Sequence, residues 1–408
     1  MLRIHQMLTS SVRLLLLMLL AVALTVPAAA EPQRVTNGPT PRDGVHQLDL
    51  EEIWRHGGED DDEVLFGLVS SVVTGADGNL YVLDSQLAQV NVFSPDGELI
   101  DTLGRQGTGP GEFQAPNQMA MLPGGGLGVS QVFPGRLVCI NLDGTPLSEI
   151  TVSDPTAGGF PLVMNVRSGG ETLVLGGMIN AYDQATNKVD QHYFVRSFGT
   201  DGVLNHEFFS KDLVMDFNSQ YHLEESNHDF VWWRLAVTPD GRVVAGIPRN
   251  TYEISVFTAD GTKEMVFGRE YESLERTVEQ SERVEAIMAT QMRQMPPGST
   301  SEIAKTEQDL YGIHCQQDGE FWVTTSRAMY SPPEGVFTQW DVFDAQGQFD
   351  RQVQTTIPGR PGHDLLMLTE HGYAVKITGF WDAALSAMGA ASDEDAEAME
   401  IVCYKIKN

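Results

Sequence analysis

Short apolar runs, each ended by a glycine-bearing turn, recur along the chain from about residue 64. The stretch "DGNLYVLDSQLAQVNVFSPDGELIDTLG", residues 77–104, holds three such runs between its turns. Asp-Gly between apolar runs favours a tight hairpin, because glycine tolerates the positive φ angles that such turns require. The pattern therefore predicts antiparallel strands joined by hairpins.

The same unit repeats further along the chain. Residues 77–82 align with 124–129, and the turn Asp96-Gly97 aligns with Asp143-Gly144. Asp240-Gly241 and Asp260-Gly261 repeat the pair of turns later in the chain. Two hairpins in a unit of about 40 to 50 residues give four strands, which is typical of one blade of a β-propeller.

The count of units sets the size of the propeller. We predict an all-β fold with six blades, at residues 64–104, 113–152, 160–209, 230–268, 310–356 and from about 364 to the end of the chain. The sixth unit lacks an outer strand, while the alternating segment "HQLDLEEIWRHGG", residues 46–58, has no partner of its own. We expect this N-terminal strand to close the ring, which would remove an exposed sheet edge.

Three segments exceed the repeat: residues 179–192, 211–229 and 271–307. In the third, between blades four and five, the apolar residues Leu274, Val278, Ile287 and Met288 recur near helical spacing. We predict a helical insertion, either packed on the propeller or acting as a mobile lid.

The N-terminus predicts export. Arg3 and Arg13 precede an apolar run that ends in Ala28-Ala29-Ala30, the pattern of a cleaved signal peptide. We assign residues 1–30 to a signal peptide, 31–44 to a linker and 45–408 to the propeller. The location would be periplasmic or secreted, and no later segment would span a membrane.

Charge and cysteine content exclude some classes of function. The formal net charge is −30, with 56 acidic residues against 26 Lys and Arg. Because phosphate binding relies on clustered basic residues, nucleic acid is not an expected partner. The three cysteines, Cys139, Cys315 and Cys403, are too few for a disulfide framework.

The segment "GTGPGEFQAP", residues 107–116, is followed by a glycine-rich turn and an apolar strand. With the outer hairpin "FSPDGELIDTLG", residues 93–104, it resembles the NHL-repeat group of six-bladed propellers and their bacterial relatives. The resemblance implies a six-bladed propeller over nearly all of the mature chain.

Loops between the second and third strands of each blade, and loops leading into its first strand, would open onto one face. Arginine and aromatic residues in such loops are candidate anchors for a ligand, because these types dominate binding hot spots. The candidates are Arg136, Tyr182, Trp232, Arg249, Arg327 and Trp381.

A metal site is the alternative. Propeller enzymes such as gluconolactonase-like hydrolases and the peptidylglycine amidating lyase place carboxylates, amides or histidines around the channel mouth to hold a cation. By that resemblance, the metal candidates are His206, His222, His228 and His314, with Asp216 or Asp229. No motif in the chain has metal-ligand or nucleophile spacing.

Two functions therefore remain open. The sequence favours a non-catalytic binding or scaffold module, without a cofactor, that presents its loop-bearing face to a protein, peptide or glycan. The alternative is a metal-dependent, lactonase-like hydrolase or lyase with Ca²⁺ or Zn²⁺ at the channel mouth.

Overall fold

The computed structural model describes residues 31–59, 61, 63–152, 158–391 and 398–407. The predicted signal peptide, residues 1–30, lies outside the described residues. Residues 34–408 form one unit, and the propeller described below lies within it. No helix in the described part of the chain is long and apolar enough to cross a membrane.

The described residues form six sheets of four or five strands and one small sheet of two strands. In each of the first five blades, four antiparallel strands follow one another in chain order. Blade one contains β4 (Val69–Thr74), β5 (Leu80–Asp84), β6 (Gln89–Phe93) and β7 (Leu99–Leu103). Blade two contains β8 (Pro116–Met121), β9 (Leu127–Gln131), β10 (Arg136–Ile140) and β11 (Ile150–Thr151). Six sheets in this order confirm the predicted six-bladed propeller.

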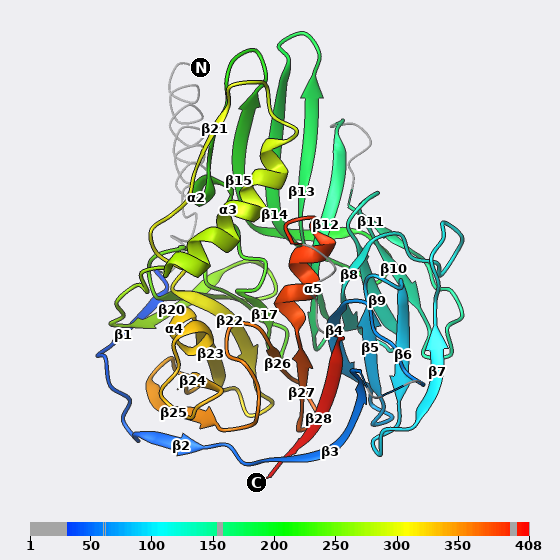
Figure 1. Ribbon diagram of the computed structural model, residues 1–408, viewed down its shortest axis with the longest axis vertical. Coiled ribbons are helices and arrows are strands. Elements are labelled where there is room, and N and C mark those ends of the chain that lie inside the picture. The colour runs from blue at the N-terminus through cyan, green and yellow to red at the C-terminus, as the bar shows by residue number, and fades with distance from the viewer. Residues whose placement is uncertain (1–30, 60, 62, 153–157, 392–397, 408) are drawn as a thin grey trace, which may run out of the picture. The chain divides into compact units, whose positions relative to one another are not determined.

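Blade three has much longer strands than its neighbours. It contains β12 (Phe160–Gly169), β13 (Thr172–Asp183), β14 (Lys188–Phe198) and β15 (Leu204–Asp216). Its last three strands extend well past the other blades at the top of Figure 1. Of the segments that exceed the repeat, residues 179–192 are therefore mostly strand, and residues 211–229 begin with the end of β15.

Blades four and five each gain a fifth strand from the N-terminal segment. Blade four contains β17 (Leu235–Val237), β18 (Val243–Ala245), β19 (Glu253–Phe257) and β20 (Lys263–Arg269), with β1 (Gln33–Asn37) added at its outer edge. Blade five contains β22 (Leu310–Cys315), β23 (Phe321–Thr325), β24 (Thr338–Phe343) and β25 (Phe349–Thr355), with β2 (Val45–Gln47) in parallel beside β25.

Part of the segment predicted as a linker, residues 31–44, forms the strand β1. Asn37 explains why this segment is held: its side-chain amide donates 2.9 Å hydrogen bonds to the carbonyl oxygens of Gly268 and Gly347. One polar side chain thus joins the outer edges of two blades.

The sixth blade joins the two ends of the chain. It contains β26 (Leu365–Leu368), β27 (Tyr373–Thr378), β28 (Glu400–Ile406) and β3 (Leu50–Gly57). β3 pairs antiparallel with β28, with Trp54 opposite Cys403. Figure 1 shows the two strands side by side, blue against red. The predicted closure by the N-terminal strand is confirmed.

Burial follows position within a blade. All five residues of the second strand β5 are buried, whereas the outer strand β7 buries only Leu103. An inner strand is covered on both faces by neighbouring blades, and this explains its nearly continuous apolar sequence. The core consists of layers between blades, such as Tyr81 and Leu83 packed with Leu127 and Val129.

The insertions gather on one face. The second contains β16 (His222–Glu224) and α2 (Glu225–His228), and the third contains α3 (Val278–Met292) and β21 (Thr300–Glu302). β16 and β21 pair in parallel as the two-stranded sheet. The predicted helix is confirmed as α3, and it is docked on the propeller: Arg283 donates a 3.1 Å hydrogen bond to the carbonyl of Gly362 and stacks over Tyr330.

Two further helices, α4 (Ser326–Tyr330) and α5 (Phe380–Ala387), connect the second and third strands of blades five and six.

Candidate functional site

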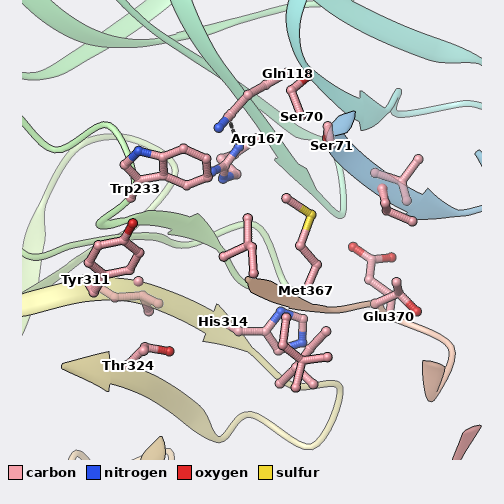
Figure 2. A pocket seen from close by; sticks show the side chains of 18 of the residues that line it. Ser70, Ser71, Gln118, Arg167, Trp233, Tyr311, His314, Thr324, Met367 and Glu370 are labelled. Atoms are coloured by element: carbon pink, nitrogen blue, oxygen red, sulfur yellow. Dashed lines mark hydrogen bonds between the residues drawn. The ribbon is translucent and has the colours of Figure 1, made fainter. Parts of the chain in front are cut away.

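A cavity of about 280 Å³ lies at the centre of the propeller. Its wall comes mainly from the first strands of five blades, β4, β8, β12, β22 and β26, and from Trp233 just before β17, with further residues from β23, β24 and α4. Most of the wall is apolar, and Val72, Ile313, Leu366 and Met367 are among its residues. Figure 2 shows Trp233, Tyr311 and Met367 directed into this space.

Arg167, on β12, is the basic side chain of this wall. Its Nε donates a 3.0 Å hydrogen bond to the carbonyl of Leu235, and its Nη1 donates to the carbonyl of Val166 at 2.8 Å and to the side-chain oxygen of Gln118. All three acceptors are neutral, and no described carboxylate lies within ion-pair distance of this guanidinium. Burial lowers the pKa of Arg167 to about 10, so the side chain is still cationic at neutral pH.

Figure 2 shows the Arg167 guanidinium beside Gln118, with Ser70 on the same side of the cavity. The second terminal nitrogen of Arg167, Nη2, makes no hydrogen bond with the described residues. The hydroxyl oxygen of Ser70 is buried and likewise has no hydrogen-bond partner among them. A buried hydroxyl without a partner is uncommon inside proteins, because it costs free energy, whereas Nη2 of the half-buried Arg167 is not among the buried atoms without a partner.

His314, on β22, is the one predicted metal candidate that lines the cavity. Burial lowers the pKa of its imidazole to about 4, so the ring is neutral at physiological pH. Glu370 lies in the turn after β26, at the end of the cavity where the hairpin turns gather. The surrounding protein raises the pKa of this carboxyl by desolvation, although the side chain remains partly open to solvent.

None of the six predicted ligand anchors lines the central cavity. Arg136 forms an ion pair with Glu149 at 3.0 Å. Arg249 pairs with Glu225 at 2.9 Å and donates to the carbonyl of Thr306. These two arginines are already engaged within the protein.

The predicted aromatic anchors differ in exposure. Trp232 is half-buried against Tyr193 and Phe230, and Trp381 packs against Tyr311 and Phe380. Tyr182 is 52% exposed on the long hairpin of blade three. Among the three predicted aromatic anchors, Tyr182 is therefore the one that is freely accessible at the surface.

Arg327, the sixth anchor, lines a second cavity of about 280 Å³ between blades four and five. It stacks over Tyr271 and donates to the carbonyl of Glu272. The cavity also contains Arg269, whose pairing with the buried Asp341 at 2.7 Å leaves it charge-compensated. The roles predicted for the six anchors stay predictions.

The four candidate histidines are not brought together. His222 faces Thr300 and Glu302 in the two-stranded sheet, and His228 lies between the hydroxyls of Tyr193 and Tyr221. Burial, with a contribution from Lys211, lowers the pKa of His228. Within the described residues, no group of three or more His, Cys, Asp or Glu side chains is placed to hold a metal ion.

His206 lies apart from the other candidate histidines. It is near the start of β15, with its ring edge-on to Phe208 and directly against the turn that contains Gly261. Because β15 is 13 residues long, its start reaches the opposite end of the blade from His222.

Sequence reasoning missed Arg167. A signal was present, since "FPLVMNVRSGG", residues 160–170, places one arginine in the predicted first strand of a blade. First strands are covered on both faces, so a charged residue there is unusual. The repeat alone did not show that this side chain borders a cavity.

The comparisons with known proteins agree with this architecture. A model of a domain family described as a 6-bladed beta-propeller matches residues 59–157. The chain is a six-bladed β-propeller. The finer resemblance to the NHL-repeat group stays a prediction, and a search among curated proteins found no match.

Three solved structures are similar to this chain at low sequence identity. A protein of Bacteroides fragilis proposed to be exported is 12% identical, with a TM-score of 0.47, over 92% of this chain and 99% of that chain. A DUF4221 family member from Bacteroides vulgatus is 14% identical, with a TM-score of 0.46, over 88% and 99%. A gluconolactonase from Xanthomonas campestris is 13% identical, with a TM-score of 0.43, over 91% and 98%.

Proposed function

We propose that the protein is an exported binding module that takes a small, largely apolar molecule into the cavity at the centre of its propeller. It would act in the periplasm or outside the cell, as its N-terminal sequence indicates. The proposal names a binding activity and assigns no catalytic residue.

The observation that carries the proposal is the make-up of the cavity wall. Apolar side chains from several blades surround about 280 Å³ of space, and a few polar groups, including Arg167, Ser70 and His314, interrupt them. Small-molecule sites in proteins typically combine an apolar lining with a few placed polar groups. Transfer of an apolar ligand from water into such a space is favourable, at roughly 25 cal/mol for each Å² buried.

A macromolecular ligand on the loop-bearing face is a separate proposal. The exposed Tyr182 and the long strands of blade three support it. The central cavity has the stronger support, because it brings several orienting groups to one largely apolar space.

The test is a titration with a neutral fluorescent naphthylamine probe. We expect the probe to bind the wild-type protein with an increase in fluorescence. Met367→Trp should abolish this binding, because the larger side chain fills the space into which Met367 points.

Met388→Trp is the matched control, since Met388 is 50% exposed at the end of α5. This variant should bind the probe as the wild type does. If Met367→Trp, folded by circular dichroism, binds the probe as well as Met388→Trp, the central cavity is not the binding site.

A further inference from the structure

The central cavity contains a cation without a counter-charge. Arg167 donates only to neutral oxygens, and the pKa of His314 in the same wall is low enough to leave that ring uncharged at neutral pH. A half-buried guanidinium without an anionic partner has lost part of its hydration, and hydrogen bonds to neutral groups offset that cost only in part. The site is thus complementary to one negative charge.

We propose that the ligand of the central cavity is a small organic carboxylate, whose apolar body fills the space and whose carboxylate is received by Arg167. This inference rests on the proposed function and adds the chemical class of the ligand. The Nη2 nitrogen of Arg167 supplies the donor, since no hydrogen bond within the described protein uses it.

The acids of the wall do not compensate Arg167. Both oxygens of the buried Asp364 are used, accepting from the backbone N–H of Arg360 at 2.8 Å and of Gly379 at 3.0 Å. Glu370 lies at the turn end of the cavity, and no ion pair joins it to Arg167 among the described residues. Asp364 instead ties the loop that leads into β26 to the start of α5.

The overall negative charge of the protein bears on how it would bind small anions. At a formal net charge of −30, the surface repels small anions, so a non-specific preference for a carboxylate is not expected. A measured preference for an anion over its neutral counterpart would have to arise from a local positive group. Arg167 is that group in the central cavity.

The experiment compares octanoate with octanol, which share an apolar chain and differ in the charged end, by isothermal titration calorimetry. We expect the wild type to bind octanoate at least about tenfold more tightly than octanol, because a charged hydrogen bond contributes more than a neutral one. The preference should persist at high salt, since buried charges are weakly screened.

Arg167→Gln should remove the preference for octanoate while octanol still binds, and Arg167→Lys should keep part of it. Arg196→Gln is the control from the same blade, because Arg196 is paired with Glu207 on β15 and lies outside the cavity. It should leave the preference unchanged. Thermal melts of each variant establish that it is folded.

The outcomes separate the two proposals. If octanol binds as tightly as octanoate, or if folded Arg167→Gln keeps the wild-type preference, the carboxylate inference is overturned and the cavity remains a binding site. If the neutral naphthylamine probe binds and octanoate does not, the same conclusion holds. If neither the probe nor either octyl compound binds, the proposed function fails together with this inference.

Discussion

The guanidinium of Arg276 holds the carboxylate of Glu307 through two hydrogen bonds, Nε to Oε1 at 2.9 Å and Nη2 to Oε2 at 3.1 Å. The same guanidinium also donates two hydrogen bonds to Glu225, at 2.6 and 2.7 Å. Only 3% of the Arg276 side chain is exposed. One arginine therefore joins the start of the third insertion to its end and to the second insertion.

Because of these contacts, we expect Arg276→Met to loosen the third insertion, residues 271–307. The substitution leaves the carboxylate of Glu307 without its ion-pair partner, while Glu225 keeps Arg249, and breaking a buried ion pair in this way costs about 3–5 kcal/mol. Native-state hydrogen exchange at the amides of α3 should report the loss. Arg293→Met, an exposed site on the same insertion, is the matched control, and equal exchange in the two variants would contradict this role of Arg276.

The closing strand should contribute strongly to stability through Trp54. This side chain is 8% exposed, stacks on Phe93 with ring centroids 5.2 Å apart, and donates to the carbonyl of Pro95. Trp54→Ala should lower the free energy of unfolding by about 3–5 kcal/mol. Ile53→Ala, at a 40% exposed neighbour, should change it little. Guanidinium denaturation measures both, and similar midpoints would show that β3 does not seal the ring.

Gly97 should resist substitution for two separate reasons. Its φ is +90°, and a Cβ there would lie 2.5 Å from the Trp54 ring. Gly124 has a similar φ of +84° but open space around it. Gly124→Ala should cost about 1–2 kcal/mol from backbone strain alone, and Gly97→Ala should cost more. Combining Gly97→Ala with Trp54→Ala should recover the difference if the clash is its cause, as a double-mutant cycle would measure.

The lowered pKa of His314 predicts that the stability of the protein depends on pH. Burial lowers the pKa of its imidazole from 6.5 to about 4, so the unfolded chain binds a proton more readily between these values. The stabilising contribution of the neutral ring is complete above the unfolded pKa and is lost as the pH falls toward about 4. In melting curves over this range, His314→Gln should lack this part of the decline.

His222→Gln supplies the comparison for His314, since His222 is exposed in the two-stranded sheet. Its melting temperatures should follow the wild-type profile. An unchanged slope in His314→Gln would mean that the ring is protonated or hydrated in the folded protein.

Helix α3 begins with a capping box that should contribute to its stability. The Thr277 side chain accepts from the backbone N–H of Gln280 at 3.2 Å, and the Gln280 side chain accepts from the N–H of Thr277 at 2.8 Å. Thr277→Ala should reduce the stability of α3 by about 1 kcal/mol, whereas Thr277→Ser should keep most of it. Hydrogen exchange in the first turn of α3 is the measurement, and equal protection in both variants would argue against the cap.

The candidate site was only partly predictable. The sequence singled out His314, but it placed the expected anchors on surface loops, where Arg136 and Arg249 turn out to be paired with Glu149 and Glu225. Each partner lies in another segment of the chain, so the sequence around the arginine does not reveal it. His206 lies near the start of β15 and His222 beyond its end, a separation that the sequence did not reveal.

The sequence by itself determined the number of blades, their hairpins and the closure by residues 46–58, because turn chemistry and strand alternation act between near neighbours. Only the tertiary structure decided that five first strands meet around a cavity and that Arg167 borders it without a counter-charge. These properties depend on how side chains from separate blades pack in three dimensions. The charge balance of a buried site is set by neighbours that are far apart in the chain.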